Sequence, residues 1–318
     1  MIGYFELKHK IIKFLPFFNL LSLLSFNFAP QLLTHLSQLM QIFNDIIPLR
    51  DTLNAKKVGN ISVGLVPTMG ALHEGHLELI KTAKGECDFV VCSIYVNPKQ
   101  FNNHNDLSKY PRTLEEDLRK LGQENCDYVF CPSNEVMYPK EGLSMNFGRI
   151  GTLLEGEFRP GHFDGVGLVV SKLFNIVKPD KAYFGQKDLQ QFAIINMLVD
   201  SLNFDIELKC VPTIRNNNGL ALSSRNMRLT EEGLSKALTL NRAMNYAKSE
   251  LQASSDFKKI RNTVIQMFNN SQVELEYFEI VDKNTFESIV DYTKLDNAAI
   301  CVAGYVEGVR LIDNMLLN

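Results

Sequence analysis

Several features that would place a chain in a specialised class are scarce or missing in this sequence. Its 318 residues include no tryptophan, only 6 histidines and only 6 cysteines, and no two cysteines form a Cys-x-x-Cys pair. This spacing excludes the common zinc-ligand patterns, and it predicts reduced thiols of a cytoplasmic protein without a disulfide framework. The formal net charge of −3 argues against a basic surface for nucleic acid, so we expect no nucleic-acid partner.

The remaining composition is that of an ordinary globular protein. Hydrophobic residues make up 45% and charged residues 22% of the chain, which is enough apolar material for one large or two smaller domains. We find no internal repeat and no low-complexity run.

The first 39 residues depart from this composition. Three lysines precede an apolar stretch at Phe14–Ala29, and no further charge occurs before Asp45. Lysines before an apolar stretch are typical of a secretory signal or a membrane anchor, but this stretch is short for a membrane span and contains Pro16. The interpretation we favour is that Met40 is the biological start. Residues 1–39 are then an apolar leader outside the fold, and no membrane partner is expected.

From Met40 onward, strand-like and helix-like segments alternate. Apolar runs rich in β-branched residues predict strands at 61–66, 88–96, 126–132, 181–185 and 206–214, and helical spacing predicts helices at 76–85, 110–122 and 188–202. Such alternation predicts an α/β fold with a Rossmann-like doubly wound parallel sheet. Sheets of this type bind ligands at the carboxyl ends of their strands.

One of these helices carries a start signal. Thr113 and Glu116 have the T-x-x-E spacing of a capping box, and Gly122 is expected to close the helix.

The pattern changes after the polar stretch Asn216–Gly219. A long helical segment at 230–251 is followed by apolar runs at 273–282 and 298–315, which are typical of a small antiparallel sheet. We therefore predict a Rossmann-like domain at 40–216 and a smaller α+β C-terminal domain at 217–318.

Two of the six histidines lie in the single turn "VPTMGALHEGH". This turn connects a predicted strand to a helix that begins near Gly75, where free amides and the positive end of the helix favour an anion. Gly70 and Gly75 would let the backbone approach a phosphate, and His73 and His76 would donate to its oxygens. Their i, i+3 spacing differs from the i, i+4 spacing of the H-E-x-x-H zinc motif. Two histidines satisfied by the local backbone are the structural alternative.

Three further polar segments follow strand ends or the predicted domain junction. They contain Asn97 and Gln100; Lys187, Asp188, Gln190 and Gln191; and Ser223, Ser224 and Arg225. Each alone is also typical of a cap or a loop. Together they predict a site for a polyphosphate and a small polar substrate.

The strings "PTMGALHEGH", "YVNPKQF", "YPRTLEEDL", "RPGHFDGV", "KLFNIVKPDKAYFGQKDLQQ" and "GLALSSRN" occur in this order. They resemble the successive motifs of the pantothenate synthetase (pantoate–β-alanine ligase) family, and the resemblance runs from residue 40 to the C-terminus. Within the wider nucleotidyltransferase superfamily, His73–His76 resembles the HIGH motif and Ser223–Asn226 a KMSKS-like motif.

The resemblance implies an AMP-forming ligase that joins (R)-pantoate and β-alanine to pantothenate. Pantoate would attack the α-phosphorus of ATP and release pyrophosphate, and β-alanine would then attack the pantoyl adenylate and release AMP. The resemblance also implies Mg²⁺ and a cytoplasmic homodimer, with ATP and pantoate bound by the domain at 40–216. Because the reactive adenylate must be protected from water, we expect the smaller domain at 217–318 to act as a lid.

The resemblance carries over to single residues. ATP would be bound by Met69, Gly70, Ala71, Leu72, His73, Glu74, Gly75, His76, Gly185, Gln186, Lys187, Asp188, Ile214, Leu222, Ser223, Ser224 and Arg225. His76 would be the proton donor. Gln100 and Gln191 would hold pantoate, with Gln100 also beside β-alanine. The metal ligands are not assigned: Glu116 and Asp117 are candidates, but Glu116 is already expected in the capping box, so we expect the phosphates to hold Mg²⁺.

The chemistry explains these residue types, because charge develops on the α-phosphate and on pyrophosphate. Lys187, Arg225 and the two histidines of the turn, with Mg²⁺, would supply a positive field. Two alternatives stay open. One is another small-molecule nucleotidyltransferase, which would not need both Gln100 and Gln191. The other is a membrane-anchored nucleotide-binding protein without turnover, which the intact Lys187 and Arg225 disfavour.

Overall fold

The computed structural model describes residues 40–57, 59–140, 142–253, 256–289 and 295–317. Residues Met40–Asn318 form one compact unit, and the expectations for the leader at 1–39 lie outside the described residues. No helix in the described part of the chain is long and apolar enough to cross a membrane.

The larger sheet has six strands that are all parallel. They are β1 (Gln41–Phe43), β2 (Val63–Thr68), β3 (Phe89–Ile94), β4 (Tyr128–Phe130), β5 (Lys181–Gly185) and β6 (Glu207–Val211), in the spatial order β1-β4-β3-β2-β5-β6. The doubly wound parallel sheet is therefore confirmed, and the prediction for β5 agrees to the residue. The short edge strand β1 was not predicted.

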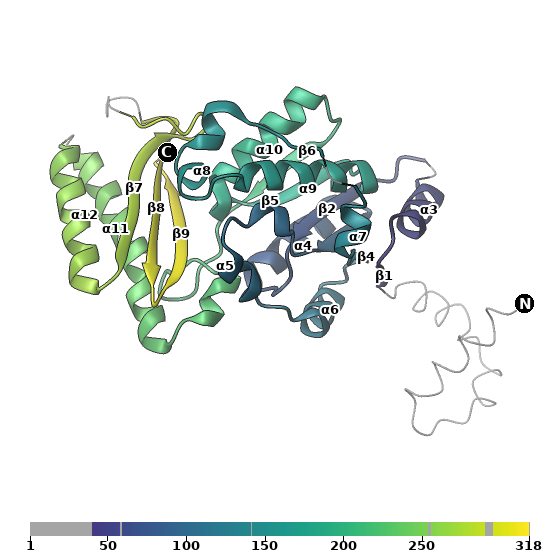
Figure 1. Ribbon diagram of the computed structural model, residues 1–318, viewed down its shortest axis with the longest axis horizontal. Helices are drawn as coiled ribbons and strands as arrows, with labels where there is room; N and C mark the ends of the chain where they lie inside the picture. Colours follow the sequence, from purple (N-terminus) through teal and green to yellow (C-terminus); the bar gives the residue numbers. More distant parts are fainter. Residues whose placement is uncertain (1–39, 58, 141, 254–255, 290–294, 318) are drawn as a thin grey trace, which may run out of the picture. The chain divides into compact units, whose positions relative to one another are not determined.

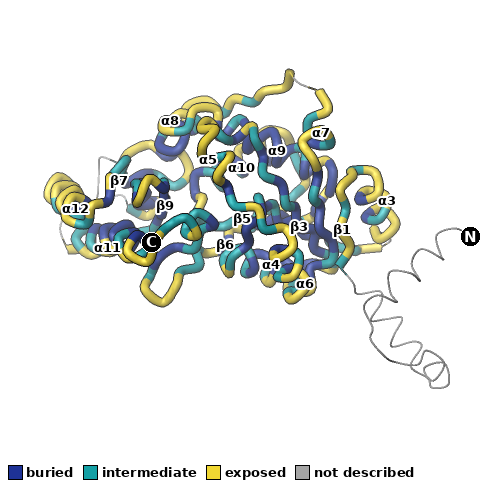
Figure 2. Tube along the Cα trace, turned by 60° about the horizontal axis from the view of Figure 1, so that its bottom comes forward, coloured by how far each residue is buried: buried dark blue, intermediate teal, exposed yellow. Residues whose placement is uncertain are grey.

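Helices cover both faces of this sheet (Figure 1). One face packs against α3 (Ile46–Lys56), α9 (His162–Val177) and α10 (Leu189–Leu202), and the other against α4 (Glu74–Glu86) and α6 (Leu114–Gln123). The central strands are buried, whereas the outer turns of the helices are exposed (Figure 2). Since both faces are covered, the apolar runs of the strands are nearly continuous, as expected for a parallel sheet.

Shorter elements form most of the connections. They are the 3₁₀ turns η1 (Pro98–Gln100), η2 (Gly148–Thr152), η3 (Gln186–Asp188) and η4 (Ser224–Arg228), and the helices α5 (His104–Ser108), α7 (Asn134–Met137) and α8 (Glu155–Phe158).

The predicted capping box of α6 is wrong. Thr113 is the N-cap, but its hydroxyl donates to Oδ1 of Asp117 at 3.2 Å, and no side chain caps the helix. Glu116 is exposed and pairs with Arg119 at 2.7 Å instead. Gly122 lies inside the last turn, and the helix ends at Gln123. The T-x-x-E spacing did not predict the cap because Asp117, one residue further on, competes for the hydroxyl.

The smaller sheet is antiparallel, as predicted. Its strands are β7 (Glu274–Asp282), β8 (Ala298–Val306) and β9 (Val309–Leu316). Helices α11 (Glu231–Ala253) and α12 (Phe257–Ser271) share one apolar cluster with this sheet. A second cluster joins the sheet to η2, α9 and α10 of the larger part.

A buried ion network also connects the two parts. Arg310 on β9 donates to both carboxylate oxygens of Glu155 on α8 at 2.7 Å, and it also pairs with Glu276 on β7. Tyr277 donates its hydroxyl hydrogen to Glu155 at 2.7 Å. Burial would raise the pKa of Glu155, but the hydrogen bonds and charge of Arg310 outweigh burial and lower that pKa to about 2.

Candidate active site

A cavity of about 190 Å³ lies at the carboxyl ends of β2, β3, β5 and β6. Thr68, Tyr95, Gly185 and Pro212, which end or follow these strands, contribute to its wall. The chain winds outward in opposite directions from β2 and β5, so the cavity lies at the topological switch point, where ligands of such sheets bind.

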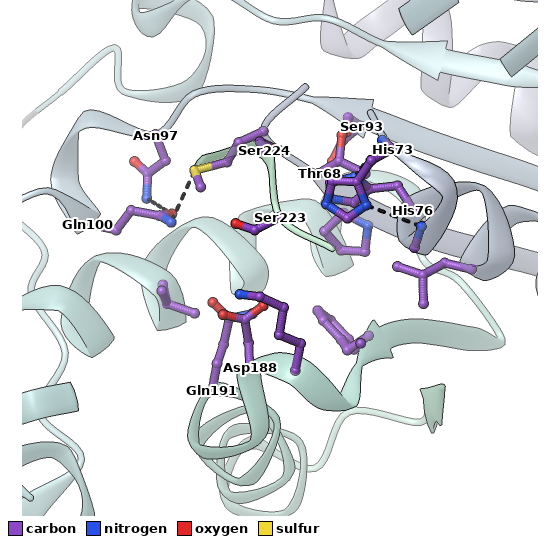
Figure 3. A pocket seen from close by; sticks show the side chains of 18 of the residues that line it. Thr68, His73, His76, Ser93, Asn97, Gln100, Asp188, Gln191, Ser223 and Ser224 are labelled. Carbon is purple, nitrogen blue, oxygen red and sulfur yellow. Dashed lines mark hydrogen bonds between the residues drawn. The ribbon is translucent and has the colours of Figure 1, made fainter. Parts of the chain in front are cut away.

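Most of the residues predicted for the site line this one cavity, although they come from five separate segments. They are Met69, His73, Gly75, His76, Gln100, Gly185, Lys187, Asp188, Gln191, Ile214, Leu222, Ser223, Ser224 and Arg225. Figure 3 shows His73 and His76 beside each other on one side of the cavity, Asn97 and Gln100 on another, and Asp188 and Gln191 together on α10 and the turn before it.

Five predicted residues lie outside the wall: Gly70, Ala71, Leu72, Glu74 and Gln186. The amides of Ala71 and Leu72, two residues of the predicted ATP-binding turn, donate to the buried carboxylate of Asp117 at 2.9 and 2.7 Å. Asp117 therefore holds the turn from behind. Glu74 is exposed, and Gln186 donates to Oδ1 of Asn314 on β9 at 3.3 Å.

The two histidines cap their own helix reciprocally. The Gly75 amide donates to Nδ1 of His73 at 3.1 Å, and the His73 amide donates to Nδ1 of His76 at 3.3 Å. Both Nδ1 atoms are thus acceptors, so the neutral rings carry their hydrogen on Nε2. Neither Nε2 atom has a hydrogen-bond partner in the described part of the chain, and both rings line the cavity. A Cβ at Gly75 would lie 2.9 Å from the His73 ring, which explains the glycine at this position.

The pKa values of the two histidines favour neutral rings, whereas the sequence analysis expected them to add positive charge. Burial, the neighbouring His76 and then Lys187 lower the pKa of His73 to about 2. Burial and Lys187 lower the pKa of His76 to about 4, although Asp188 opposes them. Near neutral pH the turn therefore offers two Nε2–H groups without charge.

The positive charge comes from other residues of the cavity wall. Lys187 is the only lysine among the described residues that line the cavity, and its charge lowers the pKa of both histidines. Arg225 donates to Asp106 on α5 at 2.7 Å, and Arg228 donates to the second oxygen of the same carboxylate at 2.9 Å. The guanidinium group of Arg225, which was predicted to bind phosphate, is thus already paired with Asp106.

The KMSKS-like segment also contacts the histidine turn. Ser224 donates to the carbonyl of Ala71 at 2.9 Å, and the Ser223 hydroxyl accepts from the amide of Arg225 at 3.3 Å. The amide of Leu222 donates to the carbonyl of Ile214 at 3.0 Å. These bonds fix Ser223 and Ser224 in the cavity wall, with Ser224 held against the histidine turn.

The part of the cavity near Gln100 is polar at one end and apolar along one side. Gln100 and Asn97 are both buried, and Val166, Val169 and Val170 of α9 supply apolar wall. Gln190, in contrast, donates to the carbonyls of Ile150 and Leu153 and does not line the cavity.

Arg159 and His162 line the cavity but were not predicted as site residues. His162 donates from Nδ1 to the carbonyl of Gln100 at 2.9 Å, and Arg159 donates to its Nε2 at 3.1 Å. Burial and Arg159 lower the pKa of His162 to about 3, so this ring is neutral too. The string "RPGHFDGV" marked the segment, but only the fold reveals its contact with Gln100.

Two buried hydroxyls of the cavity wall, Ser93 Oγ and Thr213 Oγ1, have no hydrogen-bond partner among the described residues. Burying an unpaired hydroxyl is unfavourable, so both are suited to a polar ligand atom.

The described residues contain no group of three or more His, Cys, Asp or Glu side chains that could hold a metal ion. Glu116 and Asp117, the two metal-ligand candidates, are engaged elsewhere. Asp188 is the only carboxylate among the described residues of the cavity wall. This donor set fits Mg²⁺ held mainly by substrate phosphates, with one carboxylate available.

Comparison with known proteins gives a consistent result. The family model for pantoate-β-alanine ligase matches residues 41–316. A pantothenate synthetase of Cytophaga hutchinsonii is 46% identical over 274 residues, which cover 85% of this chain and 96% of the relative. The structure of a pantothenate synthetase from Thermus thermophilus is similar with a TM-score of 0.81 at 37% identity, covering 87% of this chain and 99% of that one. The structure of a Francisella tularensis pantoate-β-alanine ligase, complexed with β,γ ATP and β-alanine, is similar with a TM-score of 0.73 at 36% identity. The match covers 88% of this chain and 98% of that one.

Proposed function

This chain belongs to the pantoate-β-alanine ligase family. We propose that its cavity binds ATP, pantoate and β-alanine, and that separate groups of residues contact the phosphates and pantoate. The protein is an ATP-dependent, AMP-forming ligase that joins pantoate and β-alanine to pantothenate. The observation that carries the assignment of residues is that neutral donors, cationic groups and amide side chains from five segments line one cavity at the switch point of the sheet.

In the first half-reaction, a carboxylate oxygen of pantoate attacks the α-phosphorus of ATP. The bond from the α-phosphorus to the bridging oxygen breaks, and pyrophosphate leaves with the electron pair. Lys187 and Arg225 stabilise the charge that develops on the phosphates, and His73 and His76 donate from Nε2 without adding charge. His76 is thus assigned as a hydrogen-bond donor to the reacting phosphate, rather than as an imidazolium.

Arg225 must exchange Asp106 for phosphate in this assignment. The exchange is feasible because both are oxygen anions that accept paired hydrogen bonds from a guanidinium group.

In the second half-reaction, the neutral amine of β-alanine attacks the acyl carbon of pantoyl adenylate. The bond from the acyl carbon to the phosphate oxygen breaks, AMP leaves, and the nitrogen loses a proton. We assign Gln100 and Gln191 to the polar groups of pantoate and the valines of α9 to its methyl groups. The adenylate is a reactive mixed anhydride, so a wall that excludes water protects it.

Mg²⁺ supplies further charge neutralisation on the phosphates when it is bound. We assign its protein contact to Asp188 and the remaining contacts to the substrate.

We extend the proposal to a cytoplasmic homodimer and to a division of the chain at residues 216 and 217. The buried network around Glu155 connects 217–318 to α8, and the shared apolar cluster connects it to α9 and α10, so a lid formed by 217–318 would have to rearrange these contacts when it moves.

The test of the function is an assay with ATP, Mg²⁺, D-pantoate and β-alanine in which AMP is measured. We expect AMP only when both organic substrates are present, and pyrophosphate exchange with pantoate alone. AMP release that does not depend on β-alanine would contradict the ligase assignment and would favour another nucleotidyltransferase.

A further inference from the structure

Tyr138 follows α7 and lies behind the turn η1, outside the wall of the cavity. Its hydroxyl donates to Oδ1 of Asn97 at 2.8 Å. Tyr138 has no role in the two half-reactions, although it is hydrogen-bonded to Asn97, which does line the cavity.

The amide group of Asn97 is fully used, so its orientation is determined by its partners. Oδ1 accepts from Tyr138 and from the amide of Lys99 at 3.2 Å. Nδ2 donates to the carbonyl of Gly165 at 3.0 Å and to Oε1 of Gln100 at 3.1 Å. If the amide of Asn97 were flipped, its NH₂ group would face the amide of Lys99, which can only donate, and its oxygen would face the carbonyl of Gly165, which can only accept. These two backbone groups set the orientation in which Nδ2 faces Gln100, and the hydroxyl of Tyr138, which donates to Oδ1, holds the side chain in place.

The orientation of Gln100 follows from that of Asn97. Because its Oε1 accepts from Asn97, its NH₂ group points the other way, where Nε2 lies 3.2 Å from Sδ of Met69 on the cavity wall (Figure 3). Thioether sulfur is only a weak acceptor, so the NH₂ group remains available for a better one. Gln100 thus presents hydrogen-bond donors, which suit a carboxylate or hydroxyl oxygen.

The surroundings hold Tyr138 in the donating form and in place. Nζ of Lys99 lies 5.0 Å and Nζ of Lys172 lies 5.8 Å from the centre of its ring, and the centre of the Tyr95 ring lies 6.3 Å away. Burial raises the pKa of Tyr138, so the hydroxyl stays protonated. The turn itself packs tightly on α9, where a Cβ at Gly165 would lie 2.2 Å from the carbonyl oxygen of Lys99.

We propose that Tyr138 is a positioning residue for pantoate, which acts through Asn97 to aim the NH₂ group of Gln100 at the oxygens of this substrate. The inference rests on the proposed function, because it takes pantoate as the ligand of Gln100. It assigns a role in substrate binding to a side chain that does not touch the substrate.

The test is the substitution Tyr138→Phe, which keeps the ring and both lysine contacts and removes only the hydroxyl. One neutral hydrogen bond changes an equilibrium by about three- to tenfold, so we expect KM for pantoate to rise by about that factor. We expect kcat and KM for ATP to stay within about twofold, because a contact made equally in the ground state and the transition state affects KM alone.

Tyr183→Phe is the matched control. It removes another buried phenol hydroxyl, which contacts Cys87 and Glu86 on the far side of the sheet and does not line the cavity. We expect it to leave KM for pantoate unchanged. Thermal unfolding of both variants would show that each is folded.

An unchanged KM for pantoate in Tyr138→Phe would overturn the inference, and so would an equal rise in KM for pantoate and ATP, which indicates a general loss of structure. Neither result would affect the proposed function, since that is tested by the wild-type enzyme. If the wild-type enzyme makes no pantothenate, the function itself fails.

Discussion

Two sets of residues that line the cavity, a neutral side and a charged side, differ in charge. The histidine turn has its inner amides bound by Asp117 and its rings held neutral by burial, so it offers fixed donors without charge. Lys187 and Arg225, which line the same cavity and form its charged side, carry the positive charge. The difference teaches that a motif rich in histidine near a helix N-terminus can orient a phosphate while the charge comes from segments more than 100 residues further along the chain.

The largest effect is expected on the charged side. Lys187→Met should lower kcat/KM by about 10³, because one well-placed donor to a developing charge contributes on the order of 10²–10³ and Lys187 also carries the charge. Lys81→Met, on the outer face of α4 in an exposed pair with Glu124, is the control and should leave the rate unchanged. Steady-state kinetics of both variants measures this effect. A loss of kcat/KM below tenfold in Lys187→Met would contradict the proposal that Lys187 stabilises charge on the phosphates.

On the neutral side, His76→Ala should lower turnover by about 10² without unfolding the protein. His76→Gln, which restores a neutral N–H donor, should recover part of this loss if the ring acts without charge. The exposed His104 provides the control, His104→Ala, which should turn over at the wild-type rate. Full activity in His76→Ala would remove this residue from the mechanism, and equal losses in the alanine and glutamine variants would argue against a neutral donor.

Because three buried histidines are held neutral, the free energy of unfolding should depend on pH. His73, His76 and His162 have folded-state pKa values of about 2, 4 and 3, which lie below the unfolded value of 6.5. The unfolded chain therefore binds more protons as the pH falls below 6.5. The free energy of unfolding should decrease there by up to about 1.4 kcal/mol per pH unit for each histidine.

Urea unfolding at pH 7, 6 and 5 measures this slope. Glu155 does not obscure it, because its stabilisation is lost only as the pH falls below about 4.5. His162→Gln should reduce the proton uptake by about one. A free energy of unfolding that is the same at pH 7 and pH 5 would show that these rings are not held neutral.

The smallest effect is expected where a carboxylate competes with the ligand. Asp106→Asn should lower the Kd for ATP by a few-fold, about the contribution of one partly exposed ion pair, because it frees Arg225 and Arg228. Isothermal titration gives the Kd directly, with Asp200→Asn on the exposed side of α10 as the control. Weaker ATP binding in Asp106→Asn would mean that Asp106 supports the site and does not compete for it.

The sequence predicted the sheet well because its strands are apolar runs bounded by clear turns. The edge strand β1 was missed because three residues give no periodicity, and α9 and α12 were not predicted. The errors in α6 have a local cause, since Thr113 bonds to Asp117 instead of entering a capping box.

The sequence brought together residues that line one cavity, but it did not indicate their partners or their charge states. The motifs placed His73, His76, Lys187 and Arg225 in one site, and all four line the cavity. Their charges depend on burial and on distant partners, such as Asp106, which is 119 residues from Arg225. No sequence spacing gives such contacts, so the neutral and the charged side could not be told apart before the fold was known.

The most direct test of this division is the ¹⁵N NMR spectrum of the histidine side chains at pH 7. For His73 and His76 we expect neutral rings with hydrogen on Nε2 and an unprotonated Nδ1, as the acceptor bonds from the Gly75 and His73 amides require. Rings protonated on both nitrogens at pH 7 would contradict the account, because the histidine turn would then carry charge itself.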